Sequence, residues 1–197
     1  PYVTYDNNYI ESEWWALKSI YDRGLLYKGF KIVPYCPRCG TALSSHEVAQ
    51  GYKDVREKSV FVKFKAKGRE NTYFLAWTTT PWTLPSNVSL AMNPRENYAE
   101  IEAEDGARYI LAEYEYAEYE PLFPFAAGKY REKGWYVVNA DYVTLTDGTG
   151  IVHNAPAFGE DDAQVGKAYG LPFVKFVDDR GRMTEETGAY AGLFVKE

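Results

Sequence analysis

A threonine- and proline-rich stretch at residues 77–87 constrains the fold more than any other feature of the sequence. It reads Trp-Thr-Thr-Thr-Pro-Trp-Thr-Leu-Pro-Ser-Asn and lies between apolar runs at 73–76 and 88–92. Proline fixes φ and lacks an amide hydrogen, so Pro81 and Pro85 stiffen this stretch and prevent it from pairing as a central strand. We therefore predict a strand, a rigid hydroxyl-rich loop that walls a pocket, and a second strand. The alternative is a β-edge turn whose threonines only reflect β propensity.

The remaining pattern predicts a β-rich chain. Apolar and polar side chains alternate over residues 60–67, and Asp105-Gly106 is a strong hairpin signal between residues 98–104 and 108–111. We predict an α+β fold with a β-barrel-like core of short, mostly antiparallel strands and a few small peripheral helices. Helices are expected from Asn7 or Asn8 to Arg23, at 112–119 and at 160–169, and further strands at 30–33, 73–77, 88–92, 134–141, 151–154 and 173–177.

The domain organisation follows from where these patterns change. Residues 1–50 are expected to form an N-terminal helix and a Cys-x-x-Cys junction segment, and residues 51–197 the core. The first helix is preceded by almost nothing, which indicates a cut through a longer chain. No apolar run approaches the roughly 20 residues of a membrane span, and two cysteines are no disulfide framework, so we expect a cytoplasmic protein without a membrane partner.

The charge limits how a nucleic acid could be held. The 197 residues carry a net charge of −6, whereas a stand-alone nucleic-acid binder usually shows a basic patch or a high isoelectric point. Any nucleic acid must therefore be touched locally or be held mostly by another part of a larger protein. Two basic clusters exist, and solvated strand faces explain both: Lys63, Lys65, Lys67 and Arg69, then Lys129, Arg131 and Lys133.

Cys36 and Cys39 form a Cys-x-x-Cys turn that is followed by Gly40. Such a turn aims two thiolates at one metal, but a structural zinc site needs four ligands. His46 is the only spare ligand nearby. Either the pair is half of a site that is completed elsewhere, or it is reduced and free of metal.

Two further residues could carry chemistry. Asp162 stands in the first turn of a predicted helix, where the helix dipole favours its ionised form, and a fixed carboxylate suits an ammonium group. Helix capping alone would also explain it, although the neighbouring Asp161 fits that role better. His153 follows a strand and could be a base, a ligand, a pocket wall or a structural residue. No nucleophilic triad is indicated, so hydrolysis would use a positioned water.

These residues resemble the editing domain that is inserted into class I isoleucyl-tRNA synthetases. The resemblance rests on residues 36–47, 77–87, 148–156 and 159–162, and extends over essentially the whole chain. Valyl and leucyl relatives typically have Thr-Thr-Arg-Pro where this chain has Thr-Thr-Pro-Trp at 79–82, and they lack a histidine at position 153. Class I nucleotide-binding signatures and an anticodon-binding region are not found, so the chain resembles an excised domain without the synthetic active site.

The resemblance implies hydrolysis of valine that is wrongly attached to the isoleucine tRNA, and of valyl adenylate as a further substrate. It implies that Asp162 holds the α-ammonium group and that His153 borders the amino-acid side chain and excludes isoleucine. Thr78, Thr79 and Thr80 would bind the terminal adenosine and position water. The other substrate-binding residues are expected to be Trp82 and Thr83, with Asn87 supporting the loop.

The same resemblance sets the cofactors and partners. Editing itself needs no cofactor, ATP belongs to the absent synthetic domain, and zinc to the full-length parent, where a second Cys-x-x-Cys lies beyond the insertion. The expected partners are the 3′ end of tRNA(Ile) carrying valine and the rest of the parent synthetase. Two alternatives stay open at this point: a non-catalytic module that binds the tRNA acceptor end, and a valyl-type editing domain that clears threonine.

Overall fold

The computed structural model divides into two compact units, residues 1–31 and 32–197, and describes residues 2–196 apart from 112–117, 131–133 and 146–147. The first unit is dominated by helix α1 (Asn7–Asp22). Asp6, rather than the expected Asn7 or Asn8, caps it by accepting a hydrogen bond from the Asn8 amide at 2.9 Å. Gly24 follows the helix with a φ of 69°, the left-handed conformation that glycine adopts without strain.

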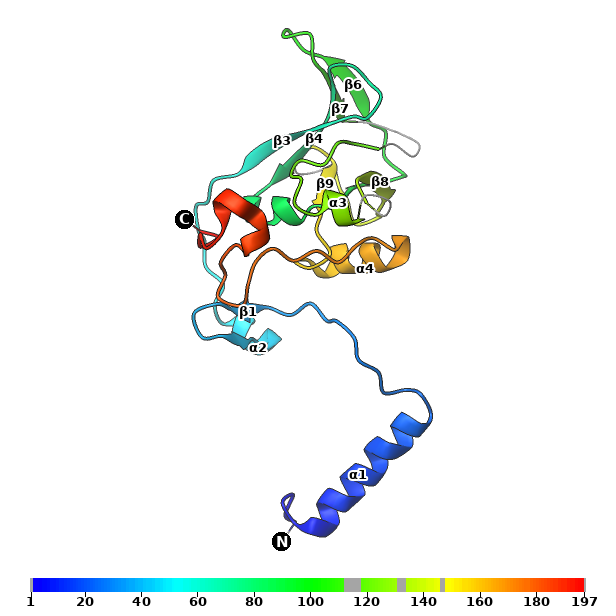
Figure 1. Cartoon of the computed structure of the whole chain (residues 1–197), viewed down its shortest axis with the longest axis vertical. Coiled ribbons are helices and arrows are strands. Elements are labelled where there is room, and N and C mark those ends of the chain that lie inside the picture. Colours follow the sequence, from blue (N-terminus) through cyan, green and yellow to red (C-terminus); the bar gives the residue numbers. More distant parts are fainter. Residues whose placement is uncertain (1, 112–117, 131–133, 146–147, 197) are drawn as a thin grey trace. The chain divides into compact units, whose positions relative to one another are not determined.

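The second unit is built from three small sheets (Figure 1). A four-stranded sheet has the order β3-β4-β7-β6, a three-stranded sheet has the order β8-β5-β9, and β1 pairs with β2. Their bounds are β1 Tyr35–Cys36, β2 Thr41–Ala42, β3 Val60–Lys65, β4 Thr72–Thr78, β5 Ser89–Met92, β6 Ala99–Glu102, β7 Arg108–Leu111, β8 Tyr136–Asn139 and β9 Ile151–Asn154.

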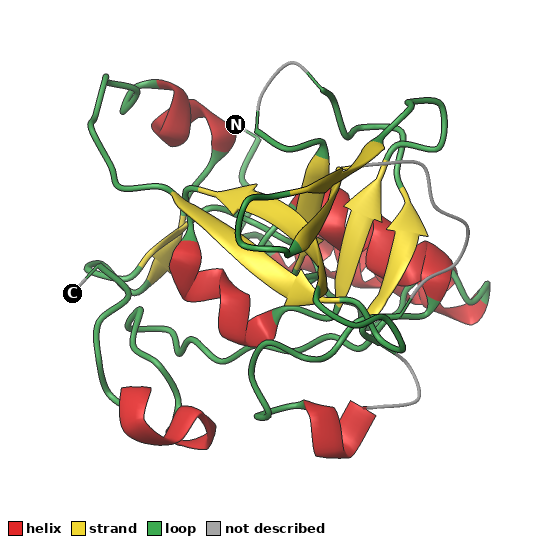
Figure 2. Cartoon of the chain, turned by 90° about the horizontal axis from the view of Figure 1, so that it is seen from above, coloured by secondary structure: helices red, strands yellow, loops and turns green. Residues whose placement is uncertain are grey.

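Short helices surround these strands. They are α2 (Ser45–Ala49), the 3₁₀ helix η1 (Pro81–Ser86), α3 (Ala127–Tyr130), α4 (Glu160–Tyr169) and the 3₁₀ helix η3 (Glu185–Tyr190). Most strand pairs are antiparallel, and β4–β7 and β5–β8 are parallel. The expected strand-rich α+β fold with small helices is therefore confirmed. The strands, yellow in Figure 2, pair into three open sheets, and the part of the chain that the structure describes forms no closed barrel.

The core lies between the two larger sheets. Buried side chains from β3 and β4 (Phe64 and Phe74) belong to the same cluster as those from β5 and β9 (Leu90 and Ile151). The connection from β4 to β5 runs through η1, so the threonine-rich stretch passes from one sheet to the other. This position fixes both ends of the stretch in the core.

Several predicted elements differ from the structure. Residues 30–33 and 173–177 form no strand, and the second segment contributes only an isolated bridge from Val177 to Met183. Strand β4 lies where a strand was expected and alternates between buried and half-buried side chains. The helix expected at 112–119 falls largely outside the described residues. The division at residue 50 stays a prediction.

Candidate functional site

The threonine-rich stretch begins at the end of β4 and turns into the 3₁₀ helix η1, where a loop was expected. Pro81 occupies the first helical position, where its missing amide hydrogen leaves no bond unmade. Thr78 ends β4, Thr80 caps η1, and Thr83 lies inside it. The short helix therefore brings three of the four threonine hydroxyls to one side of the chain within six residues.

These hydroxyls form a connected row. Thr78 Oγ1 accepts the Thr80 amide at 3.1 Å and lies 3.3 Å from Thr80 Oγ1, which in turn lies 3.4 Å from Thr83 Oγ1. Thr83 donates its own hydrogen to the Thr80 carbonyl at 2.8 Å. Thr79 is the exception, because its side chain is exposed. The row holds polar atoms in fixed positions without any charged group.

His153 on β9 extends this row from a distant part of the sequence. Its Nε2 lies 2.9 Å from Thr83 Oγ1. Because the Thr83 hydrogen is used in the bond to the Thr80 carbonyl, we assign the tautomer in which Nε2 carries the proton and donates to Thr83. The Nδ1 lone pair is then unprotonated, and this buried atom has no hydrogen-bond partner among the described residues. Burial lowers the pKa of His153 to about 4. The ring is therefore neutral at physiological pH.

Asp162 lies in the first turn of α4 and is mostly buried. Its Oδ2 accepts the Ala155 amide at 3.1 Å, and the Tyr142 hydroxyl donates to its Oδ1 at 3.2 Å. Burial raises the pKa of Asp162, and the Ala155 and Tyr142 hydrogen bonds oppose that rise. No lysine or arginine pairs with this carboxylate in the described part of the chain. When Asp162 is ionised, its carboxylate is therefore mostly buried without a cation to balance its charge.

One segment joins the two sides of the site. Strand β9 carries His153 to Thr83, and two residues later the Ala155 amide holds Asp162. Gly159, at the start of α4, is needed for this arrangement, since a Cβ there would lie 3.0 Å from the Asp162 carboxyl carbon. Strand β4, which leads into the threonines, contacts β9 although the two strands belong to different sheets. The fold thus bonds His153 to the threonine row and holds Asp162 against the backbone two residues after His153.

The other predicted residues are placed differently. The Lys196 ammonium lies 4.8 Å from the centre of the half-buried Trp82 ring. Asn87 is buried and uses its amide within the interior, donating to the Ser89 carbonyl at 2.9 Å and accepting from the Tyr119 hydroxyl at 2.6 Å. These bonds hold the Asn87 side chain in the interior at the end of the stretch, and its loop-supporting role stays a prediction.

Tyr142 and the Ala155 amide are site groups that the sequence did not indicate. Burial raises the pKa of the Tyr142 hydroxyl, with the neighbouring Asp162 charge as a second cause. Tyr142 is one of 18 tyrosines, and its position after a short strand carries no distinguishing signal. A backbone amide leaves no sequence signal at all.

Cys36 and Cys39 form the expected turn, in which the Cys39 amide donates to Cys36 Sγ at 3.4 Å. His46 lies on α2, and its Nε2 is 2.7 Å from the side-chain nitrogen Nε2 of Gln50. Among the described residues, no group of three or more His, Cys, Asp or Glu side chains could hold a metal ion. Two thiols do not fit a structural zinc site by themselves, so zinc needs ligands beyond these.

The sequence model of the family described as "tRNA synthetases class I (I, L, M and V)" matches residues 1–160. The chain belongs to this class I tRNA synthetase family. Curated relatives include isoleucine–tRNA ligases of Clostridium novyi, 56% identical, Clostridium acetobutylicum, 58% identical, and Thermus thermophilus, 47% identical. Each alignment covers 100% of this chain but only 21% of the relative.

This class I synthetase chain thus spans about a fifth of the length of the isoleucine–tRNA ligases that it matches. A solved structure described as "The crystal structure of GlLeuRS-CP1" matches 69% of the chain and 70% of that structure at 15% identity, with a TM-score of 0.41, which is too low to support an argument. No helix in the described ranges has the length and apolar character needed to cross a membrane.

Proposed function

We propose that this chain hydrolyses valine from tRNA(Ile) that has been wrongly charged. The observation that carries the proposal is Asp162, a largely buried carboxylate that accepts two neutral hydrogen bonds and has no cationic partner among the described residues. A carboxylate has about four lone-pair directions, so two remain for a ligand. The α-ammonium group of an aminoacyl ester supplies the missing positive charge.

The threonine row supplies the opposite wall. Thr78 and Thr80 present hydroxyls in fixed positions, and Thr79 exposes its side chain beside them. In the proposed reaction these groups bind the terminal adenosine and orient a water molecule toward the ester carbonyl. Water adds to that carbonyl carbon, the bond to the ribose oxygen breaks, and valine and the free ribose hydroxyl leave. The ester is already activated, so orientation and stabilisation of the oxyanion supply the catalysis.

His153 sets specificity in this proposal and does not act as the base. With a pKa of about 4, its imidazole is a weak proton acceptor at neutral pH. Its Nε2 is held by Thr83, so the ring is fixed and can limit the size of the amino-acid side chain. Trp82 completes the wall, and Asn87 supports the stretch from the interior.

Size exclusion is what such a site must achieve. One methylene group gives only about 10–200-fold discrimination in a binding pocket, and the choice of isoleucine over valine by isoleucyl-tRNA synthetase is the standard example of this limit. A second pocket that admits valine and excludes isoleucine removes the error. Valyl adenylate carries the same ammonium group and is a further proposed substrate. No cofactor is required for this step, and ATP and zinc belong to other parts of the proposed parent synthetase.

The test is to incubate the chain with valyl-tRNA(Ile) and isoleucyl-tRNA(Ile) and to follow the release of each amino acid. Release of valine alone is expected. Release of neither would favour a non-catalytic module that binds the acceptor end, and release of threonine from threonyl-tRNA in preference to valine would favour a valyl-type site.

Replacing His153 with alanine sharpens this test. The smaller side chain removes the limit on size, so isoleucyl-tRNA(Ile) should become a substrate while valyl-tRNA(Ile) is still cleaved. The measurement compares initial rates of release for both esters. Unchanged rejection of isoleucine with normal valine release would leave His153 a structural residue only.

A further inference from the structure

The predicted basic strand face is largely neutralised by its neighbours. Three cations of the first cluster form ion pairs, Lys65 with Glu120 at 3.0 Å, Lys67 with Glu118 and Arg69 with Glu100 at 2.8 Å, and Lys63 donates to the neutral Tyr109 hydroxyl. Positions 131 and 133 of the second cluster lie outside the described residues. The strand face therefore offers little free positive charge to a nucleic acid.

A different basic group lines a cavity of about 670 Å³ between the Cys-x-x-Cys turn and the turn at 178–182. The two turns pack closely, because a Cβ on Gly181 would lie 3.1 Å from the Pro37 Cβ. Three arginines line the cavity: Arg38, Arg180 and Arg182. The volume is within the range of pockets that hold small organic ligands, about 300–1,000 Å³.

The positive charge in this cavity is only partly compensated. No hydrogen bond or ion pair joins the guanidinium groups of Arg38 and Arg180 to another described side chain, and Arg182 donates only to the Gly192 carbonyl at 2.7 Å. The acidic residue of the lining, Asp179, is paired with Lys175 at 2.9 Å. Asp178 accepts the backbone amides of Arg180 and Arg182, both at 2.8 Å. Asp178 keeps its negative charge beside Arg180 and Arg182, whose amide hydrogen bonds and charges lower its pKa, so it offsets part of the charge of the three arginines.

Aromatic rings stand beside these arginines. Tyr35 and Phe194 both line the cavity, and the Tyr35 side chain is 41% exposed. Guanidinium groups bind phosphate oxygens in a bidentate manner, and an open aromatic ring stacks on a nucleobase. Arginines beside aromatic rings fit single-stranded nucleic acid better than a free phosphate, because a free phosphate has no base that could stack on a ring.

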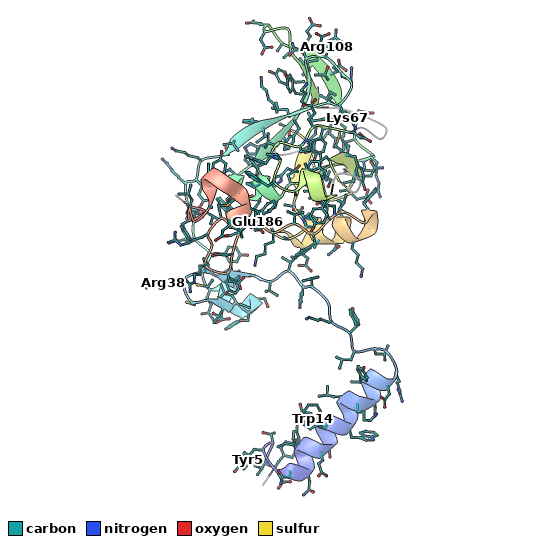
Figure 3. All side chains as sticks on the ribbon, viewed as in Figure 1. Tyr5, Trp14, Arg38, Lys67, Arg108 and Glu186 are labelled. Atoms are coloured by element: carbon teal, nitrogen blue, oxygen red, sulfur yellow. The ribbon has the colours of Figure 1, made fainter. Side chains whose placement is uncertain are left out.

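We propose that this cavity binds a nucleotide of a single-stranded RNA segment, with its phosphate on Arg38 and Arg180 and its base on Tyr35. The inference rests on the proposed function insofar as the RNA would be an unpaired stretch of the tRNA. It supplies the local cationic contact that a chain with a net charge of −6 needs. Figure 3 shows Arg38 and Arg108 at opposite ends of the second unit, so the cavity is well separated from the β6–β7 hairpin.

The experiment measures binding of a fluorescein-labelled RNA of roughly 12 unpaired nucleotides, a length within the usual range for single-strand sites. Fluorescence anisotropy is recorded at several salt concentrations for the native chain and for the double variant Arg38→Ala/Arg180→Ala. Losing the contact to this one phosphate should make the slope of log K against log salt about 0.7 less steep, equivalent to about 2.6-fold less weakening between about 50 and about 200 mM salt. Neither arginine side chain holds the fold, so the variant should remain folded.

Four further variants keep the result specific. Arg108→Ala removes one positive charge from the hairpin and should leave the slope unchanged. Arg38→Lys/Arg180→Lys should retain the slope. Tyr35→Ala should weaken binding by roughly fivefold or more, whereas Tyr35→Phe keeps the ring and the affinity. Three outcomes would each overturn the proposal. The double alanine variant could keep the native affinity and slope, Arg108→Ala could change the slope as much as the double variant does, or the native chain could fail to bind the RNA.

Valine release separates this proposal from the proposed function. At saturating valyl-tRNA(Ile) the double arginine variant should release valine at the native rate, because neither arginine touches the ester. If RNA binding depends on the arginines and no valine is released by the native chain, the cavity assignment stands and the hydrolytic function fails. If the native chain releases valine and the RNA affinity does not depend on the arginines, the hydrolytic function stands and the cavity assignment fails.

Discussion

The threonine side of the site and the Asp162 side are held by different kinds of interaction. On the threonine side, neutral hydroxyls and a neutral imidazole bond to one another and to a carbonyl, as in the contact of Thr83 with His153 at 2.9 Å. On the other side, a largely buried carboxylate accepts only two neutral donors, Ala155 and Tyr142. The first arrangement is nearly complete without a ligand, and the second lacks a cation.

This difference assigns different tasks to the two sides. A self-bonded row of hydroxyls can be rigid before substrate arrives, which suits the orientation of water and of a ribose. A buried carboxylate without a cation raises the free energy of the empty site. Binding of an ammonium group then lowers that free energy. The predictions below test this contrast, beginning with the largest expected effect.

Asp162→Ala should remove nearly all deacylation, because the ammonium group loses its only anionic partner. Losing one member of a buried charge pair costs about 2–5 kcal/mol, or at least about a thirtyfold fall in kcat/KM, with further loss from misplacement of the ester. Thermal unfolding should show unchanged or higher stability, since an unpaired buried carboxylate is removed. Asp161→Ala, an exposed acid in the same helical turn, is the control. Native activity in Asp162→Ala would end the assignment.

Acid should destabilise the chain through His153. The folded-state pKa of about 4 lies below the ordinary value of 6.5, so the unfolded state binds a proton first as the pH falls. The stabilisation is fully present above about pH 6.5 and is lost as the pH falls to about 4, with a total of about 3 kcal/mol for a shift of this size. Urea unfolding at several pH values measures it. In His153→Ala this part of the pH dependence of stability should disappear. If it persists in that variant, a group other than His153 is titrating.

Thr83→Val should weaken the threonine side without removing charge. It leaves the His153 Nε2 hydrogen without its acceptor in a buried site, which costs about 1–3 kcal/mol of stability. Because the ring is then held less firmly, the variant should release some isoleucine from isoleucyl-tRNA(Ile) while its release of valine stays near the native rate. Thr187→Val is closely matched, since Thr187 is also buried in a 3₁₀ helix and donates to a carbonyl three residues earlier, at 2.7 Å. That control lacks the imidazole contact, so equal effects of the two changes on activity would argue against a role for the Thr83–His153 bond.

Local signals in the sequence predicted parts of the fold well. Helix α4 (Glu160–Tyr169), with Gly170 in the left-handed conformation after it, and strand β9 (Ile151–Asn154) lie where they were expected. Acidic residues in a first turn and a terminal glycine act within a few residues, so sequence carries them. The segment at 30–33 has β propensity but pairs with no strand, because pairing depends on a partner that the local sequence does not specify.

The site was predictable in its residue types more than in its contacts. The sequence indicated Thr78, Thr80, His153 and Asp162, but the bond between Thr83 and His153 joins positions 70 residues apart. The turn of η1 also escaped prediction, since two prolines in six residues suggest a loop while each can occupy a 3₁₀ helix at low cost. Tyr142 gains its role only from the packing that brings it to Asp162.

Tyr142→Phe should have the smallest effect and the most informative one. The Tyr142 hydrogen bond lowers the pKa of Asp162, so its loss should raise that pKa further and move the acidic limb of the pH profile of kcat/KM to higher pH. The expected cost is about 1 kcal/mol, or about fivefold in KM, with kcat unchanged once Asp162 is ionised. Tyr98→Phe, which removes a hydroxyl that donates to the Gly150 carbonyl at 2.8 Å, should leave the profile in place. A fall in kcat with an unshifted pH profile would mean that Tyr142 contributes to packing and does not hold the Asp162 carboxylate in its ionised form.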